Sequence, residues 1–452
     1  IVFGDWSSDV CSSDLGGLLL GTTQARGNTL SRAVGDRGAF SRHSAQWRHG
    51  PGPSGPVLTA HSSLLHQTPA NHRGFFMFSD LRQTLQTLCA VDEPLVRQTR
   101  PVSGYLQVAA QVRQLHLQAR AAGRRVPLLL FEQVDDSPAE ILFNLLADEE
   151  RLMRLCRRPS GQLLADNLRA SGQSWQAFSR HLATRPLETA SGCSAALAGY
   201  SSATSLAVLP QLHYWPQDSG PYLSLACLYC PLAPHDDQLN GGVYRLRQLD
   251  DQHLSLHLNP GSQTARCLER YNRAGQPMPV TICWGTAPAQ LLAAVFPLAE
   301  GGGTLALAQR LMGVAPPLLA LPSGMRVPAD SEVIISGWVD GRRHIDEGRF
   351  ANHSGFYVAG GSCPLITIDQ VWLRPRPLLP ATLVGPPPTE NQHLGRFLWR
   401  HLGVLLANEL PFVCQLDCPA ELAFHAAVVV QVRAPGKPRQ WQEMKQQPLQ
   451  HP

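Results

Sequence analysis

The chain has 452 residues, of which 44% are hydrophobic and 16% are charged, and its formal net charge is +4. The apolar fraction suffices for a packed core, but no run reaches the roughly 18 apolar residues of a membrane span. The small net charge argues against a nucleic-acid partner. The chain has only two lysines, Lys437 and Lys445, so arginines must bind any phosphate or carboxylate in the rest of the chain.

The segment before residue 77 has the composition of a non-native leader. Asp5–Leu15 (DWSSDVCSSDL) matches the translation of a common sequencing-adapter oligonucleotide, and the first methionine is Met77. The stretch between them is rich in Gly, Ser, His and Arg without hydrophobic periodicity, which is typical of unstructured chain. We expect residues 1–76 to be a non-native or disordered leader and the protein to start at Met77; a genuine disordered extension is the alternative.

Residues 77–190 alternate between helical and strand patterns, which predicts an N-terminal α/β domain. The expected helices are Phe78–Leu88, Val102–Ala121, Ala139–Leu155 and Ser174–Leu182, and Val126–Glu132 is expected as a buried strand. Ser79 or Asp80 is suited to cap the first helix, and Ser174 the last.

Residues 191–379 are rich in strand patterns. The expected strands are Leu206–Leu212, Tyr222–Tyr229, Val243–Leu249, Leu254–Leu258, Val280–Trp284, Ser331–Val339 and Gly355–Ala359, with helices at Ala265–Ala274, Ala287–Val295 and Leu305–Met312. Asp250 and Asp251 predict a hairpin turn. Ser255, His257 and Asn259 share the polar face of one strand and are candidates to line a ligand cavity.

The C-terminal part is short. A Pro-rich linker (Val384–Pro388), a helix (His393–Ala407) and a strand (Ala426–Val432) predict a partial α/β domain over residues 380–434, and residues 435–452 have the composition of a disordered tail. The 11 cysteines include one CxxC, Cys227–Cys230, and a wider pair, Cys414 and Cys418. Their strand-like surroundings favour buried free thiols over a zinc site, and free thiols suit a cytoplasmic protein.

Seven short segments, in chain order, match the motifs of a known family. They are Phe78–Arg82 (FSDLR), Pro127–Glu132 (PLLLFE), Trp215–Tyr222 (WPQDSGPY), Asn240–Arg245 (NGGVYR), Ile282–Pro288 (ICWGTAP), Val327–Ile335 (VPADSEVII) and Glu347–Tyr357 (EGRFANHSGFY). Together they resemble the UbiD family of prenylated-FMN-dependent decarboxylases from about Phe78 to Val432.

This resemblance implies an α+β fold with a central split β-barrel, similar to flavin reductases, between an N-terminal α/β region and a truncated C-terminal α/β domain. The implied reaction is non-oxidative removal of CO2 from an aromatic or α,β-unsaturated carboxylic acid, most often in ubiquinone biosynthesis. The implied cofactors are prenylated FMN, a divalent metal (usually Mn²⁺) and K⁺, and a prenyl-FMN synthase would supply the flavin. The expected location is the cytoplasm, free or peripheral at a membrane. A homo-oligomer is also implied, although the shortened C-terminal domain commonly builds it.

The resemblance also assigns site residues. Arg245 would bind the substrate carboxylate and Glu347 would be the first acid of the site. The implied flavin contacts are Val243, Tyr244, Arg245, His257, Leu258 and Asn259. Asn240 would be a metal ligand. Each assignment has a simpler alternative. Arg245 could be a strand arginine on a solvated face, and Glu347 a loop glutamate in solvent. His257 could be a surface histidine, and Asn240 an ordinary turn asparagine.

Several positions depart from the family pattern. Asn352 stands where the family has its proton-donating acid, and an amide cannot deliver a proton as a carboxylic acid does. Thr304 lies near the position of the metal-binding glutamate, Ser262 replaces an arginine, and Ser336 replaces a glutamate. Two functions stay open: an active decarboxylase that takes its proton from water, Asp346 or His353, and an inactive UbiD-like binding or scaffold protein.

Overall fold

The computed structural model describes residues 80–156, 164–185, 197, 199–298, 302–313, 317–419 and 429–433. The predicted leader, 1–76, and tail, 435–452, lie outside the described residues. Across the described ranges, no helix combines the length and the apolar character that crossing a membrane requires.

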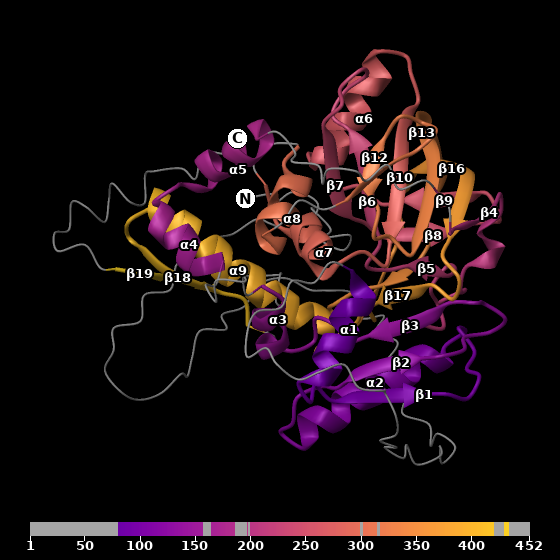
Figure 1. The fold of residues 1–452 in the computed structure, drawn as a ribbon, viewed down its shortest axis with the longest axis horizontal. Coiled ribbons are helices and arrows are strands. Elements are labelled where there is room, and N and C mark those ends of the chain that lie inside the picture. The colour runs from indigo at the N-terminus through magenta and orange to yellow at the C-terminus, as the bar shows by residue number, and fades with distance from the viewer. Residues whose placement is uncertain are drawn as a thin grey trace, which may run out of the picture. The chain divides into compact units, whose positions relative to one another are not determined.

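The N-terminal region contains a four-stranded sheet with the order β1-β2-β3-β17 (Figure 1). Its strands are β1 (Leu95–Gln98), β2 (Leu128–Phe131), β3 (Glu140–Phe143) and β17 (Leu378–Ala381). Helix α1 (Leu81–Ala90) precedes β1, and helix α2 (Gln107–Ala121) lies between β1 and β2 in the sequence. Asp80 caps α1 by accepting a hydrogen bond from the backbone N of Gln83 at 2.7 Å, which confirms the predicted cap. Strand β17 follows the last strand of the central sheet in the sequence, so this N-terminal sheet is completed by a distant part of the chain.

Two elements predicted before residue 213 are wrong. The helix expected over Ala139–Leu155 divides into β3 and α3 (Glu149–Leu155), because the apolar run Ile141–Phe143 is buried in the sheet and Asp148 starts the helix. The strand expected over Leu206–Leu212 is a single 3-10 turn, η1 (Leu206–Val208). Pro210, which has no backbone donor, disfavours a ladder there.

The central element is a curled half-barrel sheet of nine strands (Figure 1). Its order is β5-β8-β9-β16-β13-β10-β6-β7, and β4 pairs with β16. The strands are β4 (Ser201–Ala203), β5 (Tyr222–Leu223), β6 (Cys227–Pro231), β7 (Leu239–Val243), β8 (Leu246–Gln248), β9 (His253–Leu256), β10 (Met278–Trp284), β13 (Val333–Asp346) and β16 (Ser362–Leu373). The predicted hairpin turn at Asp250 and Asp251 is confirmed between antiparallel β8 and β9. The sequence did not predict β16.

Alternating side chains of this sheet enter two hydrophobic cores. In β6, Cys227 and Tyr229 belong to one core, whereas Leu228 and Cys230 belong to the other. The first core contains α7 (Pro288–Val295), whose eight residues are all buried, and α8 (Thr304–Met312). Period-two alternation therefore fixes which face of the sheet each residue serves.

The remaining elements cover or connect these sheets. They are α4 (Leu164–Ser171), α5 (Trp175–Thr184), α6 (Gln263–Arg273), β11 (Leu318–Ala320), β12 (Arg326–Pro328), β14 (Phe350–Ala351), β15 (Tyr357–Val358), α9 (Glu390–Glu409), β18 (Val413–Asp417) and β19 (Val429–Val432). Ser174 caps α5, as predicted. The predicted C-terminal helix is α9, which contacts α3, α4 and α5, and the predicted strand is β19, which pairs antiparallel with β18.

An ion pair between two of the matched motifs joins α1 to the central sheet. Arg82 donates from Nε and Nη2 to the two carboxylate oxygens of Glu332, both at 2.7 Å. Glu332 is buried, and it also accepts a hydrogen bond from the backbone N of Leu378 at 3.1 Å. This two-pronged contact assigns both motif residues a structural role.

Asp330, on the loop before β13, is a buried carboxyl group. Its Oδ2 accepts a hydrogen bond from the backbone N of Ala287 at 2.5 Å, at the start of α7. Burial raises the pKa of Asp330 to about 7, and the backbone hydrogen bond offsets only part of that effect. The folded protein therefore holds a proton here at pH values where an unfolded aspartate is ionised.

We expect Asp330→Asn to make stability less sensitive to pH. The folded pKa of about 7 exceeds the ordinary 3.8, so the contribution of this group is full below 3.8 and is lost as pH rises through about 7. Asparagine keeps an acceptor for Ala287 and cannot ionise. Between about pH 4 and about pH 8 the variant should gain on the order of 4 kcal/mol over wild type in urea unfolding, because each unit of the pKa difference corresponds to about 1.4 kcal/mol. Exposed Asp369→Asn is the control, and parallel pH profiles for Asp330→Asn and wild type would contradict the expectation.

Candidate functional site

Arg245 and Glu347 form a buried ion pair at the edge of the central sheet. Arg245 lies between β7 and β8 and is 6% exposed; Glu347 directly follows β13 and is 0% exposed. Arg245 donates from Nη2 to Oε2 of Glu347 at 2.6 Å and from Nε to Oε1. The burial of both side chains excludes the alternatives of a surface arginine and a solvated loop glutamate.

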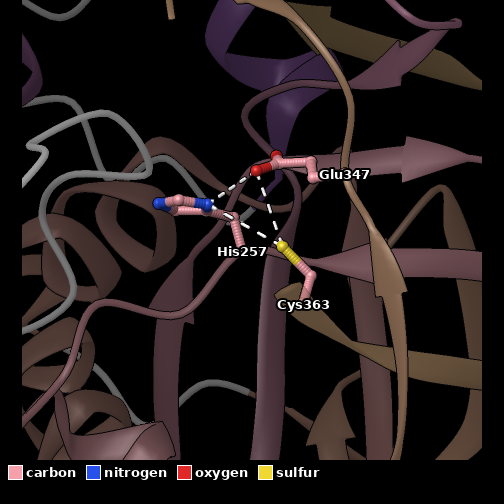
Figure 2. A group of neighbouring side chains, drawn as sticks. All are labelled: His257, Glu347 and Cys363. Atoms are coloured by element: carbon pink, nitrogen blue, oxygen red, sulfur yellow. Dashed lines mark hydrogen bonds and ion pairs between the residues drawn. The ribbon is translucent and has the colours of Figure 1, made fainter. Parts of the chain in front are cut away.

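His257 and Cys363 lie beside Glu347 of this pair (Figure 2). His257 Nδ1 lies 2.8 Å from Glu347 Oε2 and 2.8 Å from Arg245 Nη2. Cys363 Sγ lies 3.5 Å from the same carboxylate oxygen. Phe350 closes the other side, with its ring centroid 4.2 Å from the guanidinium carbon of Arg245. The guanidinium thus has a carboxylate at one edge and an aromatic ring over its plane.

Strand register explains why these residues meet. In the antiparallel pair of β16 and β9, Leu365 faces Ser255, so continuing the register by two residues sets Cys363 opposite His257. In the pair of β16 and β13, Cys363 faces Ile345, two residues before Glu347. Side chains two residues apart share a face of a strand, and β16 therefore holds the histidine and the glutamate on its two sides.

The electrostatics keep Glu347 ionised. Burial by itself would raise the pKa of this carboxyl group, but hydrogen bonds and charges from His257 and Arg245 outweigh it and lower the pKa to about 2. Burial, together with the nearby Glu347 charge, raises the pKa of the Cys363 thiol to about 12. At neutral pH the site thus holds a carboxylate and a protonated thiol, and Glu347 cannot serve as the proton donor.

The loop after Glu347 is tied to the matched segment Trp215–Tyr222. Asp218 accepts hydrogen bonds from the backbone N of Ala351 at 2.9 Å and of Trp215 at 3.0 Å. Tyr222 meets Phe350 edge-on, with ring centroids 4.9 Å apart. Asn352 is on this loop, and its Oδ1 accepts hydrogen bonds from the backbone N of Ser354, at 2.9 Å, and from the Ser354 hydroxyl. The two motifs therefore build one wall beside Arg245.

The two segments expected to contact a flavin lie side by side. The backbone N of His257 donates to the carbonyl of Arg245 at 3.2 Å. Val243, His257, Leu258 and Asn259 are half-buried, whereas Tyr244 is buried. The Tyr244 hydroxyl lies 2.5 Å from Thr264 Oγ1. This ring is therefore packed inside the protein, unlike the four half-buried residues.

Asn240 belongs to strand β7 and is not the turn residue that the alternative supposed. It is buried, and its Nδ2 donates to Thr264 Oγ1 at 2.8 Å. The neighbouring Gly241 exchanges hydrogen bonds with the Thr304 hydroxyl, at 3.3 Å and 3.1 Å. These partners are neutral hydroxyls, whereas hard divalent cations favour carboxylates. Within the described ranges, the His, Cys, Asp and Glu side chains that gather closely enough to share a metal are His257, Glu347 and Cys363, not the neighbours of Asn240.

Sequence reasoning missed Cys363, because it named no strand over Ser362–Leu373. The β-branched and apolar residues at Leu365–Ile368 (LITI) and Val371–Leu373 (VWL) were the available signal for a strand, but nothing local links the cysteine to Glu347. Cys227 and Cys230 are buried free thiols, as predicted. Cys418 is also buried, whereas Cys414 is exposed, so the expectation of buried thiols is wrong for Cys414.

Residues 189–387 match the family model described as UbiD, the 3-octaprenyl-4-hydroxybenzoate carboxy-lyase Rift-related domain. An uncharacterised protein of Chlamydia trachomatis serovar D is 29% identical over 353 residues, 76% of this chain and 59% of the relative. One of Chlamydia muridarum is 29% identical over 378 residues, 81% of this chain and 63% of the relative. The chain spans about three fifths of the length of these relatives.

Solved structures of UbiD-class enzymes share the fold. An evolved dimeric form of HmfF from Pelotomaculum thermopropionicum, in complex with prFMN, has a TM-score of 0.68 at 19% identity and covers 81% of this chain and 82% of its own. The closed form of vanillic acid decarboxylase from Sedimentibacter hydroxybenzoicus has a TM-score of 0.68 at 20% identity, covering 79% and 74%. Residues 189–387 thus form a domain of the UbiD family, and most of the chain has the fold of UbiD-class enzymes.

Proposed function

We propose that the protein is a carboxy-lyase that removes CO2 from an aromatic or α,β-unsaturated carboxylic acid. The observation that carries this proposal is the buried pair of Arg245 and Glu347, held beside the two segments expected to contact a flavin. The choice of acid, and a place in ubiquinone biosynthesis, stay predictions.

Arg245 is the residue that would bind the substrate carboxylate. Glu347 occupies the Nε–Nη2 edge of the guanidinium, so a carboxylate from the substrate would bind next to this ion pair. Phe350 and Glu347 restrict the rotation of the guanidinium. A fixed arginine of this kind orients a carboxylate without losing side-chain entropy on binding.

The chain's residues fit a flavin beside Arg245. Val243, His257, Leu258 and Asn259 are half-buried, and the backbone of His257 is hydrogen-bonded to that of Arg245, so backbone groups and apolar side chains are available near a fixed cation. When bound, prenylated FMN would accept the electron pair that CO2 leaves behind, and the protein supplies orientation and electrostatics. The surroundings of Asn240 do not fit the divalent metal, so no step here relies on Mn²⁺, and K⁺ stays a prediction.

A second candidate, an inactive UbiD-like binding or scaffold protein, is favoured by Asn352 and by the neutral partners of Asn240. The resemblance implies an acid at position 352 and a metal-binding glutamate near position 304, and this chain has Asn352 and Thr304 there.

The two functions are separated by purifying the full chain after co-expression with a prenyl-FMN synthase. A carboxy-lyase should carry flavin absorbance and release CO2 from at least one member of a panel of aromatic and acrylic acids. Arg245→Lys should raise KM, because lysine cannot form the two-pronged contact, and exposed Arg343→Lys is the matched control. A colourless protein without CO2 release across the panel would support the scaffold function instead.

A further inference from the structure

We infer that His257, Glu347 and Cys363 form a binding site for a transition-metal ion of the zinc class, separate from the metal position at Asn240. The inference rests on the positions of these three side chains and holds whether or not the protein releases CO2.

The distances between the three ligand atoms bracket those of a tetrahedral metal site. Glu347 Oε2 lies 2.8 Å from His257 Nδ1 and 3.5 Å from Cys363 Sγ, and Sγ lies 4.0 Å from Nδ1. Bonds of about 2.0–2.3 Å from zinc to nitrogen, oxygen and sulfur set ligand atoms roughly 3.3–3.7 Å apart at tetrahedral angles. Small side-chain rotations therefore suffice to place one ion between the three atoms (Figure 2).

The donor set selects the kind of ion. A thiolate and an imidazole prefer zinc, cobalt and similar ions, whereas magnesium, calcium and manganese prefer sites made of oxygen ligands. Glu347 is 0% exposed and Cys363 is 3% exposed, so these are not the scattered surface groups that gather by chance. The side chain of His257 is 18% exposed, and this gives an ion a route from solvent.

His257 Nδ1 lies within hydrogen-bond distance of two groups with opposite requirements. Nδ1 faces Arg245 Nη2, which can only donate, and Glu347 Oε2, which accepts when ionised. One ring nitrogen cannot both accept from the first and donate to the second. A metal ion bound to the lone pair of Nδ1 and to Oε2 would satisfy both atoms.

Arg245 acts as the outer partner of this site. It donates from Nε to Oε1 and from Nη2 to Oε2 of Glu347, and it thereby fixes the carboxylate with Oε2 facing His257 and Cys363, which is how outer residues orient a ligating carboxylate. Binding a divalent ion releases the Cys363 proton to solvent, so the thiolate, the carboxylate, the ion and Arg245 sum to +1. This residual charge predicts moderate affinity, and three protein ligands leave a fourth position open for water or a small ligand.

Cobalt titration of the chelator-treated full chain tests the site without any cofactor. Wild type should develop a thiolate-to-cobalt charge-transfer band that saturates at one ion per chain and is abolished by added Zn²⁺. Cys363→Ser should lose this band and weaken binding by at least about tenfold, and His257→Gln should weaken binding while it retains the band.

Cys414→Ser is the matched control, because Cys414 is an exposed free thiol on β18. Its titration should equal that of wild type. Circular dichroism checks that each variant folds. Absence of the band in wild type, or a band of unchanged intensity in Cys363→Ser, would overturn the inference. CO2 release plays no part in this readout, so failure of the proposed function leaves the result interpretable.

Discussion

Replacing Arg245 with methionine should lower the free energy of unfolding by about 3–5 kcal/mol, the cost of leaving a fully buried charge without its partner. Glu347 is 0% exposed and receives two hydrogen bonds from this guanidinium. The variant should also lose the binding of the substrate carboxylate, because methionine offers no donor. Urea unfolding at neutral pH measures the first effect, and KM measures the second.

A double-mutant cycle isolates the pair. Glu347→Gln alone should also destabilise, whereas the double variant should be more stable than the sum of the two single effects predicts. Exposed Arg273, which pairs with Glu269 one helical turn away, is the matched control. Arg273→Met should cost no more than about 1 kcal/mol. If Arg245→Met lowers the free energy of unfolding no more than Arg273→Met does, the pair of Arg245 and Glu347 is not a buried ion pair.

Changing Asn352 to glutamate should raise the rate of CO2 release by about 10²–10⁴-fold, the usual contribution of a positioned general acid. The proton that replaces CO2 on the product must come from an acidic side chain or from water, and an amide supplies none. Asn352 lies on the loop that Asp218 holds beside Arg245, so a glutamate there would enter the same wall of the site.

Asn352→Gln has the length of glutamate without its acidity and is the control. It should not exceed wild type. A wild-type rate equal to that of Asn352→Glu would show that another group delivers the proton, with Asp346, His353 and water as the remaining candidates. If both proteins bind flavin and release no CO2, the scaffold function gains support.

Local rules allowed part of the fold to be predicted. Asp80 and Ser174 start helices because a side-chain oxygen next to an apolar stripe caps free backbone donors within three residues. The hairpin at Asp250 and Asp251 follows from the same short-range logic. The helix expected over Ala139–Leu155 failed at β3 because burial between β2 and β17 outweighs local helical preference.

The sequence by itself determined which groups are present: the matched motifs in order, an arginine at position 245, and an amide at Asn352 where the resemblance implies an acid. Only the tertiary structure decided which of these groups meet. Cys363 is 106 residues from His257 and 16 from Glu347, and no local pattern joins them. Pairing of β16 with β9 on one side and β13 on the other brings them together, because strand partners are chosen by burial of whole sheets and not by neighbouring residues.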